Sequence, residues 1–365
     1  MKKAVRIIIF LICIATFILP KTSPVFAREF YFEIIADEKR YIYFYPEIYY
    51  DKNGELQLLD KESIANRICL DLTVLPQNAT IEFLPSSSEK FKIYAEKNGR
   101  IIDKSLLIKQ IDLALLTGKT KITVKSSLIK ANVTKESLLK QSQQRSNFST
   151  FYGYSNAQRK HNIALCASFI NGSVIYPNEE FSFNKTVGKR SEERGFLPAK
   201  VILNGAFATG VGGGVCQVSS TLYNAFLLAG LTPVESHNHT LCVEYVSPSF
   251  DAMVSDTGSD LRFKNPFDFP IFIECNANGE RIDITIYGEK PKYEYKLISK
   301  VTETIQASTS EVYTNDKSLK NVSAKNGLKS EGYIYVYENG KLIEIKTLRK
   351  DTYKPLNGIV YIVNN

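Results

Sequence analysis

This sequence of 365 residues lacks several features that mark common protein classes. It has no internal repeat and no low-complexity tract, which excludes a repeat array or a fibrous chain. Its N-terminal apolar stretch, Ile7 to Leu19, has only 13 residues, and a helix of that length reaches about 20 Å, short of a hydrocarbon core of about 30 Å. Tryptophan is absent and histidine occurs three times, so imidazole chemistry is confined to three positions.

The chain also lacks a strong charge of either sign. Its first 27 residues hold four of the 46 lysines and arginines and no acidic residue. The remainder therefore has 42 basic and 38 acidic residues and a formal net charge of +4. This balance does not indicate a nucleic-acid partner, whereas a mildly basic surface suits an anionic cell wall.

The first 27 residues have the composition of a secretory signal. A positive segment with Lys2, Lys3 and Arg6 precedes the apolar stretch, and the small-residue pattern of a cleavage site ends at Ala27. We expect an extracytoplasmic protein that is cleaved after Ala27. Without cleavage, the segment would be a weak anchor and the only contact with the membrane.

The cysteines point to at least one free thiol. Removal of the signal takes Cys13 and leaves five cysteines, an odd number that cannot all pair within one chain. Cys166 lies on one helical face with Ile163 and Ile170, which predicts a core position. The other four are Cys69, Cys216, Cys242 and Cys275.

Local patterns predict an α+β protein of several domains. Strand-like runs and two short helices, capped by Asp60 and Asp103, predict a mixed N-terminal domain. A helix with Ser155 as its N-cap opens the central domain, and alternating residues around the turn Asn339-Gly340 predict a small all-β C-terminal part. The expected boundaries are 1–27 for the signal, 28–140, a polar linker at 141–150, 151–290 and 291–365.

The most informative segment is a triple glycine, Gly212 to Gly214, followed by Cys216. Apolar residues spaced by three and four predict that Cys216 opens a helix that ends at Gly230. A thiol in the first helical turn lies beside unpaired N–H groups and the positive end of the helix dipole, which lower its pKa. The alternative is a glycine loop followed by a buried, inert cysteine.

Two of the three histidines, His237 and His239, lie about twenty residues beyond Cys216. In a strand they would face one pocket, where an imidazole could activate the thiol and protonate a leaving amine. Asp251 could orient the imidazole. A zinc site made by the thiolate and two imidazoles, and a purely structural role, stay open as alternatives. His161 is predicted to be a surface or capping residue.

At these motifs the chain resembles the VanW-domain family. The resemblance is strongest over residues 213–225, Gly-Gly-Val-Cys-Gln-Val-Ser-Ser-Thr-Leu-Tyr-Asn-Ala, and extends to His239 and Asp251. Residues 28–140 resemble a peptidoglycan-binding domain that often precedes VanW, and 291–365 resemble a degenerate G5-type β-module. The chain departs from the family's usual residues at Ser236, Thr240, Cys242 and Met253.

The resemblance implies peptidoglycan L,D-transpeptidation without a metal or other cofactor. Cys216 would be the nucleophile, His239 or His237 the acid and base, and Asp251 the orienting carboxylate. The residues expected to bind the oxyanion or the stem-peptide substrate are Gly213, Gly214, Gln217, Ser219 and Tyr223. Two alternatives are a non-catalytic cell-wall-binding or accessory protein and a metal-dependent wall hydrolase.

Overall fold

The computed structural model describes residues 30–203, 206–316 and 318–363, so the predicted signal at 1–27 lies outside the described residues. The chain divides into two compact units, one made of residues up to Pro76 with Asn98–Lys130, the other of Gln77–Lys97 with everything from Ala131 onward. Helices and strands are mixed throughout, which confirms the α+β class. Within the described ranges, no helix is both long and apolar enough to cross a bilayer.

The first unit is a small sheet with two helices. Its main sheet has the order β2-β1-β8, with β1 antiparallel to β2 and parallel to β8. Asp60 and Asp103 cap the two helices by accepting hydrogen bonds from Ser63 N and Leu106 N, as predicted. The elements are β1 (Tyr31–Ala36), β2 (Lys39–Phe44), β3 (Ile48–Tyr50), β4 (Leu56–Leu58), α1 (Lys61–Leu72), β7 (Gly99–Ile101), α2 (Lys104–Leu116), β8 (Lys121–Val124) and β9 (Ser127–Ile129).

The second unit is built around a four-stranded antiparallel sheet in the order β10-β18-β17-β11. Helix α4 packs on β17, and α6 packs on β10 and β18. The elements up to α6 are β5 (Thr80–Phe83), β6 (Phe91–Tyr94), α3 (Lys135–Lys140), β10 (Gln143–Phe151), α4 (Ala157–Ile170), β11 (Val174–Ile175), β12 (Glu180–Ser182), α5 (Phe183–Val187), η1 (Glu192–Arg194), β13 (Pro198–Leu203), β14 (Ala206–Val211) and α6 (Val215–Leu228).

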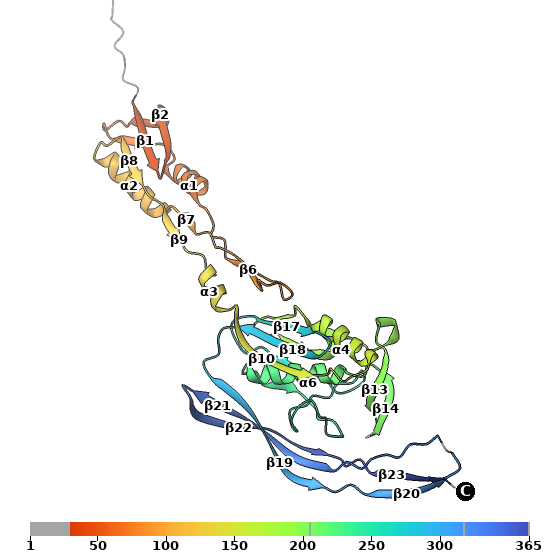
Figure 1. Cartoon of the computed structure of the whole chain (residues 1–365). Coiled ribbons are helices and arrows are strands. Elements are labelled where there is room, and N and C mark those ends of the chain that lie inside the picture. The colour runs from red at the N-terminus through yellow and green to blue at the C-terminus, as the bar shows by residue number, and fades with distance from the viewer. Residues whose placement is uncertain (1–29, 204–205, 317, 364–365) are drawn as a thin grey trace, which may run out of the picture. The chain divides into compact units, whose positions relative to one another are not determined.

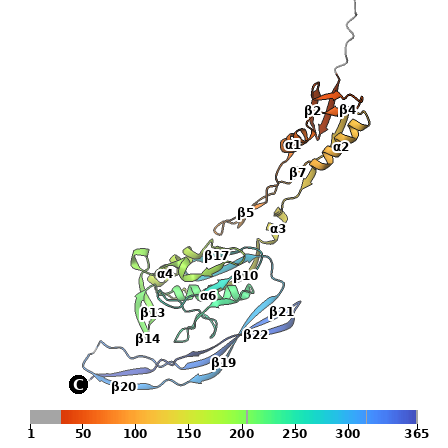
Figure 2. The same cartoon turned by 180° about the vertical axis from the view of Figure 1, so that it is seen from behind.

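Three long strands form a second sheet in the order β19-β21-β22. Helix α6 contacts β19 as well as β10 and β18, so it lies between the two sheets (Figures 1 and 2). The remaining elements are β15 (Pro233–Glu235), β16 (Arg262–Lys264), β17 (Ile271–Ala277), β18 (Arg281–Gly288), β19 (Glu294–Ile305), β20 (Thr309–Thr314), β21 (Gly327–Glu338), β22 (Lys341–Tyr353) and β23 (Gly358–Val363).

Residues 291–363 form the all-β part expected at the C-terminus, here called the C-terminal β-module. Asn339 and Gly340 join β21 to β22 with positive φ angles of 51° and 78°, as a type I′ hairpin turn requires. Ile334 and Val336 of this module are buried in the same apolar core as α6. The module is therefore packed against the central domain through a shared core.

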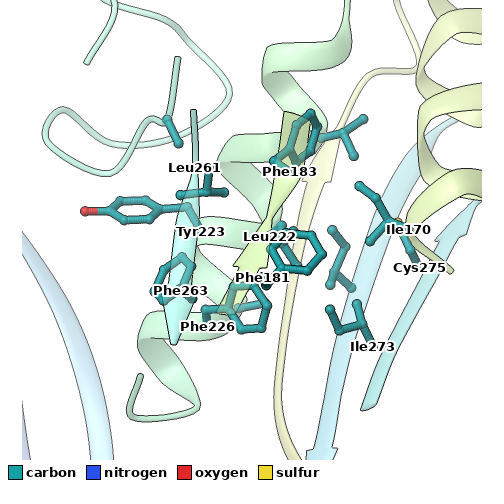
Figure 3. Close-up of a cluster of buried hydrophobic side chains, with 14 of the residues drawn as sticks. Ile170, Phe181, Phe183, Leu222, Tyr223, Phe226, Leu261, Phe263, Ile273 and Cys275 are labelled. Atoms are coloured by element: carbon teal, nitrogen blue, oxygen red, sulfur yellow. The ribbon is translucent and has the colours of Figure 1, made fainter. Parts of the chain in front are cut away.

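Helix α6 is the centre of that core, and twelve of its fourteen residues are buried. Figure 3 shows Leu222 and Phe226 among aromatic and aliphatic side chains from other segments. The helix is enclosed on nearly every side, and its buried polar residues are hydrogen-bonded. Its N-terminus, where Cys216 lies, is consequently held in a fixed place.

The predicted linker at 141–150 is wrong, because Gln143–Phe151 forms strand β10. Its polar side chains are used inside the protein. The Ser146 hydroxyl donates to Ala225 O at 2.6 Å, and the Thr150 and Thr221 hydroxyls are 2.8 Å apart. The N-cap of α4 is Asn156, one residue beyond the predicted Ser155. The linker error arose from polar residues whose partners are distant in sequence.

Candidate active site

Cys216 is the second residue of α6, which begins at Val215 directly after the triple glycine. Gly212 and Gly214 have φ of 84° and 110°, values that favour glycine strongly. Gly213 needs to be small for another reason: a Cβ there would approach Lys200 O to 2.6 Å. The glycines thus let the chain turn tightly against its own neighbours and start the helix at Val215, one residue before Cys216.

The buried Asn162 of α4 fixes this turn. Its amide nitrogen donates to Gly213 O at 3.0 Å and to Leu197 O at 2.8 Å, and its amide oxygen accepts from Leu197 N. Each polar atom of the side chain is therefore engaged. The position of the cysteine depends on a hydrogen-bond network as well as on helix packing.

The structure brings Cys216, His239 and Asp251 together. The Cys216 thiol donates to Val254 O at 3.5 Å, and the His239 imidazole lies close enough to the thiol to lower its pKa. On its other side, His239 Nδ1 lies 2.6 Å from Asp251 Oδ2, and the same oxygen accepts from the His239 backbone N–H at 2.7 Å. This is the order thiol, imidazole, carboxylate that orients a histidine toward a nucleophile.

Burial and charge act in opposite directions on these groups. Burial lowers the pKa of His239, but the hydrogen bonds and charges of Asp251 and Cys216 outweigh it and raise the pKa to about 10. Burial likewise raises the pKa of the Cys216 thiol, while His239 and Arg190 lower it by more, to below its usual value. The neighbours of the pair therefore shift the equilibrium toward a thiolate beside an imidazolium.

Polar residues of α6 hold the loop that contains Asp251. The Ser219 hydroxyl donates to Ala252 O at 2.6 Å, and the Ser220 hydroxyl accepts from Ala252 N at 2.9 Å. One turn further, the Asn224 amide donates to Phe250 O at 2.8 Å. The buried Ser and Asn side chains that follow Cys216 in the sequence thus fix the carboxylate relative to the thiol.

The C-terminal β-module completes the surroundings of Asp251. The Arg349 guanidinium donates to Asp251 Oδ1 at 2.8 Å, and the Tyr353 hydroxyl donates to the same oxygen at 2.6 Å. The Tyr353 oxygen also accepts from Ser249 N at 2.7 Å. A fully buried carboxylate needs such partners to remain ionised. Asp251 Oδ2 is bound to His239, and Asp251 Oδ1 accepts hydrogen bonds from the C-terminal β-module.

A pocket of about 820 Å³ lies over Cys216. Its walls come from the glycine turn, from the segment 239–245, from Met253 to Asp256 and from the C-terminal β-module. Five of the lining residues are cationic and two are acidic: Arg159, Arg190, Lys200, Lys325 and Lys354 against Glu244 and Asp256. A pocket of this size and charge suits an elongated ligand with anionic groups.

Several predicted site residues have other positions. His237 is not in a strand with His239; it is half exposed, and its imidazole lies 3.0 Å from Glu235 Oε1. Ser219 and Tyr223 are fully buried and do not line the pocket, so the prediction that they bind substrate is wrong. Gln217 lines the pocket, but its side chain is bound to Thr150 and Phe151 O.

The remaining predictions concern single histidines, thiols and metal ligands. His161 is exposed and its ring contacts Gly195 O, in agreement with a surface role. Cys166 is buried in the core as predicted, and all five described cysteines are free. Among the described residues, no three His, Cys, Asp or Glu side chains are placed to hold a metal ion. The ligand set of Cys216, His237 and His239 is therefore not assembled.

Sequence reasoning missed Arg349, Tyr353, Arg159 and Arg190. The first two are about a hundred residues from Asp251, in a segment whose only signal was strand alternation. Arg190 is almost buried in the pocket wall and pairs with Asp256 at 2.9 Å. For Arg159, the available signal was a cation in the first turn of a helix, where the dipole disfavours positive charge.

The fold and this site define an α+β protein with a buried Cys–His–Asp arrangement at the base of a cationic pocket. Residues 158–287 match the family described as VanW like protein, so this part of the chain is a VanW-like domain. No solved structure matches the chain.

Two curated proteins are similar to part of the chain. The uncharacterized protein YoaR of Bacillus subtilis (strain 168) is 44% identical over 171 residues, which is 47% of this chain and 56% of YoaR. The vancomycin B-type resistance protein VanW of Enterococcus faecalis (strain ATCC 700802 / V583) is 29% identical over 154 residues, 40% of this chain and 56% of that protein. The chain thus spans little more than half the length of each relative.

The five thiols are expected to differ strongly in reactivity. Cys216 has a lowered pKa, whereas burial raises the pKa of Cys69 and Cys242. Because the thiolate is the reactive form, iodoacetamide at pH 7 is expected to alkylate Cys216 at least about tenfold faster than either. Peptide mass spectrometry over a pH series measures this. Equal rates for the three thiols would contradict an activated Cys216, and His239→Gln is expected to remove its advantage.

Proposed function

We propose that the protein is an exported peptidoglycan L,D-transpeptidase that forms 3-3 cross-links through a thioester on Cys216. The observation that carries the proposal is the grouping of Cys216 with His239 in the pocket lining, together with the hydrogen bond from His239 to the buried Asp251. Similarity to a vancomycin resistance protein supports a substrate in the cell wall. Under this proposal residues 28–140 bind the wall, and the partners are stem peptides.

The first half-reaction is acylation of the enzyme. The Cys216 thiolate attacks the carbonyl carbon that joins the third residue of a tetrapeptide stem, a diamino acid, to the terminal D-Ala. The C–N bond then breaks, and the His239 imidazolium gives its proton to the departing amine, so that D-Ala leaves as a free amino acid. A thioester between Cys216 and the diamino acid remains.

The second half-reaction transfers the acyl group. The side-chain amine of a neighbouring stem attacks the thioester carbonyl, and neutral His239 takes the proton that the amine loses. The C–S bond breaks and returns the thiolate beside an imidazolium. The products are one cross-linked dimer and one D-Ala for each pair of stems. Asp251 keeps the imidazole in the same orientation through both steps.

Both steps pass through a tetrahedral oxyanion that needs hydrogen-bond donors. The N–H of Gln217 donates to Gly214 O at 3.0 Å, and that of Val215 donates to Gly212 O at 3.2 Å, so both have partners within the turn. We assign the oxyanion donors to the N–H groups of Cys216 and Gly214. This assignment narrows the expectation from the sequence, which included Gln217.

The proposal is tested by incubating the purified protein with disaccharide tetrapeptides and analysing the products by mass spectrometry. The expected result is a dimer that lacks one D-Ala, an equal amount of free D-Ala and an acyl-enzyme adduct on the peptide that contains Cys216. Binding to sacculi without these products would instead support the wall-binding accessory protein. Shortened stems without dimers, formed only in the absence of a chelator, would support the metal-dependent hydrolase.

A further inference from the structure

Arg159 is the one arginine of the pocket wall that has no carboxylate partner within the part of the chain that the structure describes. Arg190, the other arginine of the pocket lining, pairs with Asp256. Burial lowers the pKa of Arg159, and the groups that act in the opposite direction are Tyr245 and Cys216, neither of them a carboxylate. A guanidinium placed in this way is unfavourable for the protein alone.

The position of Arg159 within its helix increases that cost. It is the third residue of α4, where the unpaired N–H groups and the helix dipole already give a positive potential. A cation there weakens the helix, and nothing in the fold described above requires a charge at this position. An anionic ligand in the pocket would offset both the missing carboxylate and the dipole.

The guanidinium is nevertheless held firmly. Nη1 donates to Ser155 Oγ and Nη2 donates to Gln217 Oε1, each at 2.8 Å. Gln217 is itself fixed by bonds to Thr150 and Phe151 O, both at 3.0 Å. Two of the five N–H groups of the guanidinium are used, and three remain to donate to a ligand.

Arg159 is also next to the reactive thiol. Its stem packs on the glycine turn, since a Cβ on Gly214 would lie 3.1 Å from Arg159 Cγ. Gln217, which orients the guanidinium, directly follows Cys216. In the donor proposed above, the carboxylate of the terminal D-Ala is separated from the scissile carbonyl carbon by only the amide nitrogen and one Cα. A carboxylate on Arg159 would therefore place that carbonyl beside the thiol.

We propose that Arg159 forms a carboxylate subsite that binds the free C-terminus of the leaving residue of the donor stem. The proposal rests on the proposed function and makes it more specific. The subsite selects stems that end one residue after the scissile bond, because an additional residue moves the carboxylate away from Arg159. Gln217 and Ser155 are positioning residues for the guanidinium.

The test is a binding measurement in which no chemistry takes place. Calorimetry on the full-length Cys216→Ala protein compares a stem tetrapeptide that has a free C-terminus with the same peptide as its C-terminal amide, and with the pentapeptide. A charge-assisted hydrogen-bonded pair predicts that the free acid binds about tenfold to a hundredfold more tightly than the amide. The pentapeptide is expected to bind like the amide.

Substitutions at Arg159 then test whether this residue binds the carboxylate of the peptide. In the Cys216→Ala background, Arg159→Gln is expected to reduce the acid preference to less than about threefold, and Arg159→Lys to keep part of it. Arg281→Gln, which changes an exposed arginine of β18 outside the pocket lining, is expected to keep all of it. Thermal unfolding of each variant checks that the fold is retained.

Equal binding of acid and amide by Cys216→Ala, or an acid preference that persists in Arg159→Gln, would overturn the subsite. These outcomes are separate from a failure of the proposed function. Absence of dimers and of free D-Ala with the unmodified protein contradicts transpeptidation even if the acid preference is present. Turnover of acid and amide donors at equal rates contradicts the subsite alone.

Discussion

Replacing Cys216 by alanine is expected to abolish dimer formation and D-Ala release together. No thioester forms without the thiol, and loss of the nucleophile in a comparable triad lowers turnover by about 10⁶-fold. Alanine is the best helix former, and it removes one atom from a side chain that partly faces the pocket, so the fold is expected to remain intact. Quantitative mass spectrometry of muropeptides, with thermal unfolding alongside, measures both effects.

Cys69→Ala is the matched control for this experiment. Cys69 is also a partly buried free thiol at a helix, but it lies in the first compact unit and has a raised pKa. Its removal is expected to leave the rate of cross-linking unchanged within about twofold. Full activity of Cys216→Ala, or equal losses in the two variants, would show that Cys216 is not the nucleophile.

The second large effect is expected from Asp251→Asn, with a loss of about 10³-fold to 10⁴-fold in kcat/KM. An amide cannot stabilise the imidazolium, and its NH₂ group would face donors of His239 or of the β-module. The pH dependence of kcat/KM shows the direction in which the substitution shifts the pKa of His239. Asp251 raises the pKa of His239, so its loss lowers that pKa. The pH range in which the thiolate and imidazolium coexist therefore loses its upper part.

Asp260→Asn is the control for the second prediction. Asp260 is also largely buried, but it accepts hydrogen bonds from Ser182 and the Asn184 N–H and does not contact His239. Its substitution is expected to lower stability and leave the pH profile of the remaining activity in place. Tyr353→Phe removes one donor from Asp251 and is expected to give a small shift in the direction of Asp251→Asn. A normal pH profile for Asp251→Asn would contradict the role assigned to the carboxylate.

The positions of Cys216 and His239 could be predicted because each has a local signal. Cys216 follows glycines at the start of a helix, and His239 is one of three histidines. The structure places His239 beside both Cys216 and Asp251, although Asp251 is fully buried and does not line the pocket. His237 was wrong because β15 ends at Glu235, so the period of two that would align the histidines does not extend through them.

Other parts of the site depend on contacts that have no local signature. The polar run in β10 has the composition of a linker, and only its bonds to α6 show why those residues are buried. Arg349 and Tyr353 belong to a strand of ordinary composition. The prediction that Ser219 and Tyr223 bind substrate rested on the sequence motif alone. That motif contains buried residues that hold the site in place as well as residues that line the pocket.

The bonds from Arg349 and Tyr353 to Asp251 have a consequence for where this protein can be divided. The match to the family model ends at residue 287, whereas the donors that keep the carboxylate charged come from residues 349 and 353. A fragment trimmed to the homologous segment would lose both donors and uncover part of the common core. The family match therefore ends about sixty residues before the residues that stabilise the charge of Asp251. A chimaera that transplants this reactive centre needs the last three long strands as well.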